Sequence, residues 1–453
     1  MKLRWLWIVI LVLMIVMTCG LIVSVLGIGI FSYTSISSVT NSAESIVDQV
    51  FGGDLLSNPN ISYTETEDKT FLTGSEEITL VVENRFGDVV AQGKDTDEVF
   101  MSVVKTSWGV NEDEAMELLD LLQYEVIEEP GKLTIRVLEP QRKINRPGSI
   151  DFKLDIPINS NITFSTQNGD LYIGKVEGDV ELSSTFGNVE VKDVQNGKVL
   201  ATTQNGNVTL RGINIQDFPM EASTAFGDID VFQTNANQLK LSIGNGVMNL
   251  ENIMVDGLID LTNQFGNIGY RSGKAENLTI NSSNGAITLS GITVGNLLVG
   301  HTDFGAIEVT ETKAAEYDLL SKNGRIELNG ADEAKIKVVT DFGDIELLNI
   351  VASIINLETK NGVVIFTGSL AEDNHRVYSD FGNITIRMPS TQSIDCEIKT
   401  GFGKIESDFA ITVSGAIEEK HLSGKINEGG GLLTIETQNG NITLEKTTVV
   451  EEE

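Results

Sequence analysis

The chain has 453 residues, with 44 glycines but only 7 prolines, and its 65 acidic and 32 basic side chains give a formal net charge of −33. Such a length is enough for about two or three ordinary domains, or for one long array of repeats. Nucleic acid would repel so acidic a chain, so we expect no nucleic-acid partner. Cys19 lies inside a hydrophobic stretch, and a disulfide with Cys396, the only other cysteine, is therefore not expected.

The N-terminus has the composition of a membrane anchor. After MKLR, residues 5–31 (WLWIVILVLMIVMTCGLIVSVLGIGIF) contain no charged side chain, and about 20 such residues span a bilayer core as a helix. A cleaved signal peptide would have a shorter apolar core, and the apolar residues after Cys19 disfavour lipid modification of that cysteine. Lys2 and Arg4 indicate a cytoplasmic N-terminus. We therefore predict that residues 1–31 form a cytoplasmic stub and transmembrane anchor of a single-pass cell-membrane protein.

Two segments precede the repeats and are expected to lie outside the cytoplasm. Residues 32–75 are rich in Ser, Thr, Asn and Asp, which predicts a tether. Residues 76–157 alternate apolar and polar side chains and include one helical pattern near 111–123, where Asn111 begins a capping box. This second segment is predicted to be the N-terminal cap of the repeats.

One short repeat occupies residues 158–446, and an acidic tail, 447–453, ends the chain. Each unit contains a glycine preceded by Asn or Phe, and successive motif glycines are 18 to 21 residues apart. A nearly fixed period predicts stacked supersecondary units. The predicted repeat corners are Gly169, Gly187, Gly206, Gly227, Gly246, Gly266, Gly285, Gly305, Gly324, Gly343, Gly362, Gly382 and Gly403.

Alternation with a period of two on both sides of each glycine predicts short strands. Val180 and Leu182 precede Gly187 by seven and five positions, and Val189 and Val191 follow it by two and four. The glycine shifts the phase by one residue, as a corner would. No unit could bury its apolar row alone, so the rows must stack. We predict an all-β fold, a β-solenoid with about 19–20 residues per repeat, because a sandwich or barrel would not need such even spacing.

The residue before the motif glycine, position −1, alternates between Asn and Phe, and the strand pattern predicts that it points inward. The residues concerned are Asn168, Phe186, Asn205, Phe226, Asn245, Phe265, Asn284, Phe304, Asn323, Phe342, Asn361 and Phe381.

The length of one coil is open at this point. A coil of about 39 residues would stack Asn on Asn and Phe on Phe, whereas a coil of about 19–20 residues would alternate them at one corner. Position −2 favours the shorter coil. It reads Lys322, Asp341, Lys360 and Asp380, which then form a ladder of opposite charges instead of columns of like charge.

No set of residues has the spacing of a catalytic or metal site. His301, His375 and His421 lack metal-ligand partners and are expected on the surface, and Cys396 is expected to fill core space. There is no nucleophile elbow, zinc-protease motif or phosphate loop. We therefore predict no catalytic, cofactor-binding or metal-binding residues, no cofactor and no enzyme activity.

Two rows of aspartates recur beside the motif glycines. Asp or Asn beside Gly is typical of a turn, and this interpretation is preferred to binding of Ca²⁺ or polysaccharide cleavage. The rows are Asp303, Asp341 and Asp380 at position −2, and Asp170, Asp228 and Asp344 at position +1.

Over residues 77–446 the chain resembles the bacterial putative-adhesin β-strand-repeat family, long described as a domain of unknown function. The resemblance rests on VVENRFGDVVAQG, KLTIRV, IDFKLDIPINSNITFSTQNGDLYIG, the repeated NG and FG turns, and SGKINEGGGLLTIETQNGNITLEK. It implies a solenoid at the cell envelope and no catalytic residues. This chain departs from the family in its Phe before half of the motif glycines and in its N-terminal anchor.

These observations predict a membrane-anchored, extracytoplasmic surface protein with an adhesive or envelope-structural role. Its partner would be an unidentified cell-wall, glycan or protein ligand. The alternatives are an accessory protein of envelope stress or signalling and, less favoured, a β-helix enzyme acting on polysaccharide.

Overall fold

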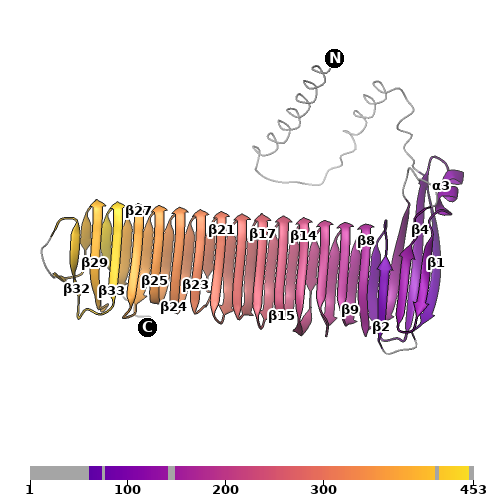
Figure 1. The fold of residues 1–453 in the computed structure, drawn as a ribbon, viewed down its shortest axis with the longest axis horizontal. Coiled ribbons are helices and arrows are strands. Elements are labelled where there is room, and N and C mark those ends of the chain that lie inside the picture. The colour runs from indigo at the N-terminus through magenta and orange to yellow at the C-terminus, as the bar shows by residue number, and fades with distance from the viewer. Residues whose placement is uncertain (1–60, 74–76, 141–147, 414–417, 448–453) are drawn as a thin grey trace, which may run out of the picture. The chain divides into compact units, whose positions relative to one another are not determined.

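A computed structural model describes residues 61–73, 77–140, 148–413 and 418–447. The described residues belong to one compact unit, Pro59–Glu453. The predicted anchor over residues 5–31 lies outside the described residues, and none of the helices that are described has the length and apolar character needed to cross a bilayer. In the compact unit, parallel strands of successive repeats stack into a β-solenoid, which confirms the predicted fold class (Figure 1).

The described residues contain the helix α3 (Glu112–Leu119) and thirty-four strands. The strands are β1 (Ile61–Leu72), β2 (Ile78–Glu83), β3 (Val89–Lys94), β4 (Glu98–Gly109), β5 (Tyr124–Glu129), β6 (Lys132–Val137), β7 (Ser149–Pro157), β8 (Ser160–Asn168), β9 (Leu171–Glu177), β10 (Val180–Phe186), β11 (Val189–Gln195), β12 (Val199–Asn205), β13 (Val208–Arg211), β14 (Asn214–Phe226), β15 (Ile229–Asn245), β16 (Met248–Val255), β17 (Leu258–Phe265), β18 (Ile268–Ala275), β19 (Asn277–Asn284), β20 (Ile287–Val294), β21 (Leu297–Phe304), β22 (Ile307–Thr310), β23 (Glu316–Asn323), β24 (Ile326–Phe342), β25 (Ile345–Asn361), β26 (Val364–Leu370), β27 (Asn374–Phe381), β28 (Ile384–Pro389), β29 (Ile394–Phe402), β30 (Ile405–Ser407), β31 (Ile411–Val413), β32 (His421–Ile426), β33 (Leu432–Asn439) and β34 (Ile442–Thr447).

One coil consists of a strand before the motif glycine, a strand after it, and a turn that leads to the next coil. β10 ends at Phe186, the chain bends at Gly187, and β11 begins at Val189. The inward positions of this coil are fully buried, as the alternation predicts: Val180, Leu182, Val189, Val191 and Val194. The apolar rows of all coils join into one continuous core, so burial of each coil depends on its neighbours.

Successive repeats pair directly, which confirms the shorter coil. β12 pairs in parallel with β10 and aligns Val199 with Val180, one repeat earlier in the chain. A coil of about 39 residues would instead have paired every second repeat.

A second bend follows six positions after the motif glycine and was not predicted. Most residues there have a left-handed backbone: Lys175, Asp193, Gly212, Gln233, Asn252, Ser272, Gly291, Glu311, Gly330 and Asn349. Gly, Asn and Asp adopt this conformation most readily, and they hold six of these ten positions. Their enrichment was a usable sequence signal.

The solenoid begins earlier than residue 158. β2 and β3 form a first coil around Gly87, and β2 pairs in parallel with β8. On the other side of this coil, β6 pairs in parallel with β2, and β7 pairs in parallel with β3. β4 pairs in antiparallel fashion with β7. The helix α3 lies within the predicted helical range, with the side chain of Asn111 accepting a hydrogen bond from the Glu114 amide (2.8 Å).

β1 corrects the predicted tether, which extended to residue 75. Its twelve residues pair with β4 in antiparallel register, from Ile61 opposite Gly109 to Leu72 opposite Glu98. None of its residues is fully buried. The strand is therefore held mainly by backbone hydrogen bonds along β4, and its side chains gave no apolar alternation to detect.

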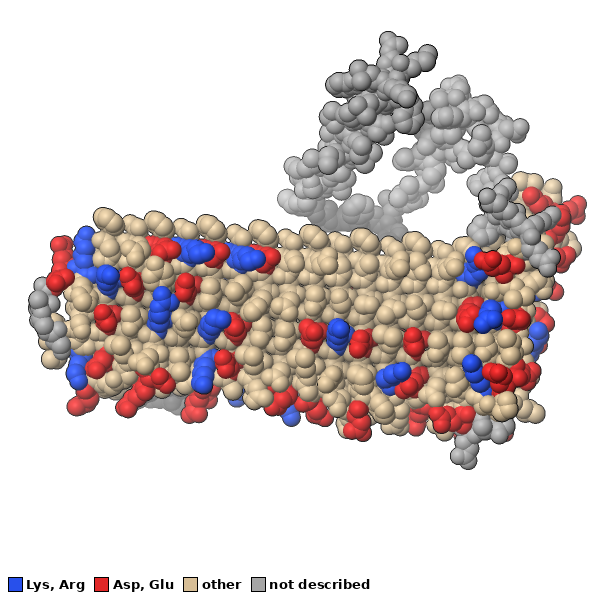
Figure 2. Space-filling view, viewed as in Figure 1, with Lys and Arg blue, Asp and Glu red and all other residues tan. Residues whose placement is uncertain are grey.

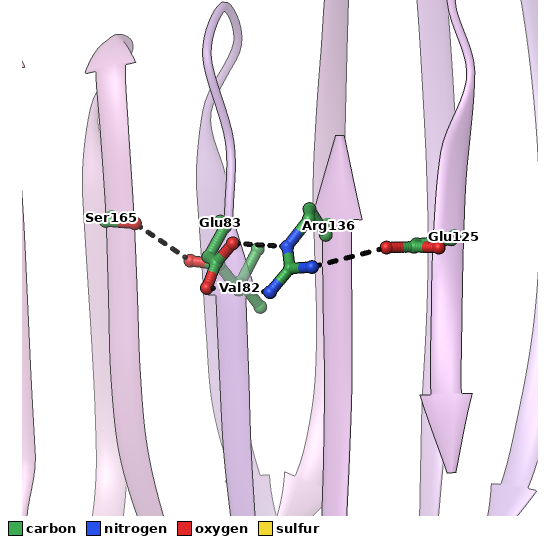
Figure 3. Close-up of polar contacts among 5 residues, drawn as sticks. All are labelled: Val82, Glu83, Glu125, Arg136 and Ser165. Atoms are coloured by element: carbon green, nitrogen blue, oxygen red, sulfur yellow. Dashed lines mark hydrogen bonds and ion pairs between the residues drawn. The ribbon is translucent and has the colours of Figure 1, made fainter. Parts of the chain in front are cut away.

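An ion-pair group links the hairpin of β5 and β6 to the first coil (Figure 3). Arg136 of β6 lies 2.5 Å from Glu83 of β2 and 3.4 Å from Glu125 of β5. The guanidinium of Arg136 lowers the pKa of Glu83. These side chains are more than a third exposed, so the pairs fix orientation and add little stability.

The C-terminal end does not follow chain order. β33 lies between β27 and β29 and pairs in parallel with both. β32 then pairs in antiparallel fashion with β29 and covers the far side of that strand. The last long strand of the chain is thus inserted into the stack, and an antiparallel strand closes its end.

The exposed corner of the solenoid as candidate functional site

The motif glycines stack directly on one another through the length of the solenoid. A Cβ at any of them after the first would lie 1.8–2.1 Å from the carbonyl oxygen of the preceding glycine in the stack. No other residue fits at such a distance, so the predicted corner role of these glycines has a steric cause. The order of the stack is Gly87, Gly169, Gly187, Gly206, Gly227, Gly246, Gly266, Gly285, Gly305, Gly324, Gly343, Gly362, Gly382, Gly440 and Gly403.

Buried hydroxyl groups satisfy the carbonyls of this stack from inside. At position −3, Thr203 donates to the Gly187 carbonyl (2.9 Å), and Ser321 donates to the Gly305 carbonyl (2.9 Å). Both side chains are buried. The Ser or Thr at this position is therefore structural, because a buried polar group needs a partner.

The aspartate row at position +1 also has a structural explanation. Each carboxylate or amide oxygen accepts a hydrogen bond from the backbone N–H at position +1 of the next coil. Asp170 accepts from Asn188 (2.6 Å), and Asp228 accepts from Val247 (2.7 Å). Asp344 accepts in the same way from Val363 (2.7 Å). These contacts support the turn interpretation of the row.

Position −1 points outward, so the predicted inward orientation of Asn168, Phe186, Asn205, Phe226, Asn245, Phe265, Asn284, Phe304, Asn323, Phe342, Asn361 and Phe381 is wrong. None of these side chains is buried. Seven phenylalanines of the corner are 52–73% exposed: Phe186, Phe226, Phe265, Phe304, Phe342, Phe381 and Phe402.

The error has a local cause. The pairing of β10 with β12 runs regularly to Ser184 and Thr203, skips one residue, and resumes at Phe186 and Asn205. The phase therefore shifts at position −2, before the glycine, and not at the glycine itself. That earlier shift turns position −1 outward.

The exposed residues form one uninterrupted row, which we call the aromatic edge. Strand pairing gives its spatial order as Phe86, Asn168, Phe186, Asn205, Phe226, Asn245, Phe265, Asn284, Phe304, Asn323, Phe342, Asn361, Phe381, Asn439 and Phe402. Phe and Asn alternate without a break in space. In the sequence they do not, because Phe402 follows Phe381 directly among the motifs.

Phe86, Phe402 and Asn439 were missed as members of this row. The break in the Asn and Phe alternation along the sequence could have identified Phe402 and Asn439. Two consecutive FG corners, followed by a final NG corner, fit the pattern only if the last strand is inserted between the other two.

Charges flank one part of the edge and alternate as predicted. Lys322 lies 2.6 Å from Asp303, and Lys360 lies 2.7 Å from Asp341. The Asp341 carboxylate raises the pKa of Lys360. The strands preceding the corners point their arrowheads to the upper rim in Figure 1, and this rim is largely tan in Figure 2, with alternating red and blue just beneath it on the C-terminal side.

The titratable candidates are dispersed. His301 lies 3.6 Å from Asp318, and His421 lies 3.8 Å from Glu397. No group of three or more His, Cys, Asp or Glu side chains among the described residues is placed to hold a metal ion.

His375 is buried, which corrects its predicted surface position. Its Nε2 lies 2.9 Å from the Ala371 carbonyl, and its Nδ1 accepts a hydrogen bond from the Ile355 N–H (3.3 Å). Both ring nitrogens of the neutral imidazole therefore have hydrogen-bond partners. Burial lowers the pKa of His375.

Cys396 is buried in the core, as predicted, and burial raises the pKa of its thiol to about 11. A neutral thiol in this setting packs as a small apolar side chain.

The fold and its corner define a class of parallel β-solenoid with glycine corners and an exposed aromatic row. The chain belongs to the family described as Toastrack DUF4097, whose model matches residues 125–273 and 271–445. This match confirms the resemblance to the adhesin-like repeat family. No curated protein matches the chain.

Solved structures that are similar to this chain include the following three. A "putative cell adhesion protein" from Clostridium sporogenes is 9% identical, with 85% of this chain and 100% of that chain covered and a TM-score of 0.15. A "putative adhesin" from Bacteroides fragilis is 11% identical, with coverage of 84% and 97% and a TM-score of 0.20. A "putative lipid binding protein" from Parabacteroides distasonis is 14% identical, with coverage of 68% and 95% and a TM-score of 0.22.

Proposed function

We propose that this chain is a membrane-anchored, extracytoplasmic scaffold that acts in adhesion or envelope structure, without enzyme activity, and that the aromatic edge is its contact surface. The observation that carries the proposal is the row of half-exposed phenylalanines along one corner. The row alternates Phe with Asn, but exposed aromatic surface gathered along one corner in this way usually marks an interaction site.

Packing within the chain does not account for the row, although the Lys420 ammonium lies 5.1 Å from the centre of the Phe402 ring. The carbonyls, amides and carboxylates around the corner are engaged between coils, and the core is complete without the rings at position −1. Asn or Ser at every corner would serve the turn equally well. The exposed rings therefore need a role outside the fold.

Residues 5–31 support the anchoring part of the proposal, and Lys2 and Arg4 support its orientation. The acidic surface would keep the external part soluble. A polysaccharide-acting enzyme would instead need free carboxylates converging on a groove, whereas Asp170, Asp228 and Asp344 are bonded to the next coil.

The test has two parts. The chain is tagged at its C-terminus, and protease added to intact cells should remove the tag. If the orientation is reversed, the tag should survive until the cells are lysed. Then cells that display the chain should adhere to cells or isolated cell walls, and replacing Phe265, Phe304 and Phe342 by Asn should remove that adhesion. Equal adhesion by the variant would reject the aromatic edge as the contact surface.

A further inference from the structure

We infer that the aromatic edge binds the aromatic edge of a second copy of this chain, with each ring of one copy seated over an asparagine of the other. The inference rests on the proposed function, because it names the partner of the proposed contact surface.

The shape of the edge is complementary to itself. Neighbouring coils are about 4.8 Å apart, so the rings recur about every 9.6 Å, with the smaller Asn side chain between them. When an identical edge faces it with a displacement of one coil, each ring of one edge lies opposite an Asn of the other. A two-fold axis passing between Asn284 and Phe304, near the middle of the row, produces this arrangement in an antiparallel pair.

The available area suits a stable pair. A phenylalanine buries about 200 Å² in a core, and the seven most exposed rings show 52–73% of their surface. They therefore offer roughly 800 Å² on each copy, or about 1,600 Å² in total, which is the size of a standard specific interface. Exposed rings at regular intervals also lose little conformational entropy on binding, because a phenylalanine has only two side-chain torsions.

The charge along the edge permits two copies to approach. Position −2 is uncharged from Gln167 to Ser283, and it alternates in sign from Asp303 to Asp380. Positions −2 and −1 therefore carry little of the chain's negative charge, and the upper rim is largely tan in Figure 2. The aspartates Asp170, Asp228 and Asp344 lie at position +1, where they accept hydrogen bonds from the next coil. Interface cores are depleted in charge in the same way.

The backbone polar groups beside the rings are already bonded within the solenoid. A glycan site needs free donors and acceptors next to its aromatic platform. Here the Gly187 N–H donates to the Asn205 carbonyl (2.9 Å), and the Asp170 carboxylate accepts from Asn188 (2.6 Å). The polar side chains that the edge presents outward include the Asn amides of position −1 and the amides of Gln167, Gln204 and Gln264 at position −2. A second copy offers a ring to each Asn and an Asn to each ring.

The antiparallel pair would join two membranes. In each copy the chain enters the described unit at the cap end, through β1 (Figure 1). Antiparallel edges place the two cap ends, where the chains enter their described units, at opposite ends of the pair. Chains that enter from opposite ends can belong to two different cells.

Sedimentation equilibrium of the full chain in density-matched detergent tests the inference. We expect a reversible dimer, with at least a tenfold higher Kd in the double variant Phe304→Asn, Phe342→Asn, because central aromatic residues dominate interfaces. Asn323→Phe adds apolar surface but fills a gap, so we also expect at least tenfold weaker association. Phe218→Asn, which replaces an exposed ring away from the edge, is the matched control and should leave the Kd unchanged. Thermal unfolding of each variant confirms that it folds.

Three results would overturn the inference. A wild-type chain that stays monomeric at high micromolar concentration has no such partner. Stronger association of Asn323→Phe would indicate unspecific apolar adhesion in place of a fitted pair. A monomeric chain whose edge variants lose binding to cell walls or glycans would place a different ligand on the edge, and in that case the proposed function survives while the second copy does not.

Discussion

Asn439 is the register partner of Phe381 on the neighbouring parallel strand, although the chain passes through Phe402 before it reaches Asn439. The inserted strand β33 thereby separates two phenylalanine coils. The alternation of the aromatic edge is thus a property of the assembled stack, maintained where the order of the chain would break it.

Removal of residues 432–453 should open the C-terminal coils. β27 and β29 both lose their shared neighbour, and the Cys396 thiol loses cover from Leu433, its register partner on β33. In a Cys19→Ser background we expect a thiol reagent to modify Cys396 at least about tenfold faster than in the complete chain, because local opening controls access to buried groups. Removing only residues 448–453 is the control. Equal rates for both truncations would mean that β33 does not hold these coils closed.

Replacing a corner glycine by alanine should be costly. In Gly246→Ala the new Cβ would lie 2.0 Å from the Gly227 carbonyl oxygen, so the stack must shift, and we expect about 2–4 kcal/mol of destabilisation. Gly269→Ala, on β18 of the next coil, is the matched control, since the nearest neighbour of its new Cβ would be 3.7 Å away. Urea unfolding followed by circular dichroism compares the two. A similar loss in both variants would contradict the steric account of the corner.

The buried hydroxyls of position −3 should contribute through their hydrogen bonds. Thr203→Val keeps the shape of the side chain but leaves the Gly187 carbonyl without its donor, and we expect a loss of about 1–3 kcal/mol. Thr209→Val, at a partly exposed position of the adjoining strand, should change stability by less than about 0.5 kcal/mol. The same unfolding experiment measures both. No difference between them would show that the carbonyl finds another donor.

Acid should destabilise the C-terminal half through His375. Burial lowers the pKa of His375 below its ordinary value of 6.5, so the unfolded chain binds this proton at a higher pH than the folded chain does. Its contribution to stability is therefore present above pH 6.5 and is lost as the pH falls below that value. His375→Gln should be less stable at pH 7.5, but its midpoint temperature should fall less between pH 7 and pH 5.5. Parallel pH profiles for wild type and variant would exclude this role.

The solenoid and its coil length followed from the sequence because they depend on local rules. Three sequence signals report on neighbouring coils: the spacing between glycines, the alternation around them, and the opposite charges of Lys322 and Asp341. The observed pairing of adjacent repeats agrees with all three. The helix near residues 111–123 was recognisable for a similar reason, since its capping signal is local.

What could not be predicted depends on backbone geometry or on contacts distant in sequence. The orientation of Phe186 was decided by a one-residue irregularity before the glycine, which leaves no mark in a pattern of apolar residues. β1 pairs through its backbone, and His375 is buried because two backbone groups happen to meet its ring. The insertion of β33 was detectable in principle, but only by assuming that the alternation holds in space.

The place of β33 also has a consequence for synthesis of the chain. Coils up to β27 can assemble in order as the chain emerges, but β29 has no native partner on its inner side until β33 has been made. The far end of the molecule therefore closes only when the last residues arrive. A chain cut short by early termination or by a protease would carry an open sheet edge there, and quality-control proteases could distinguish it from the complete fold.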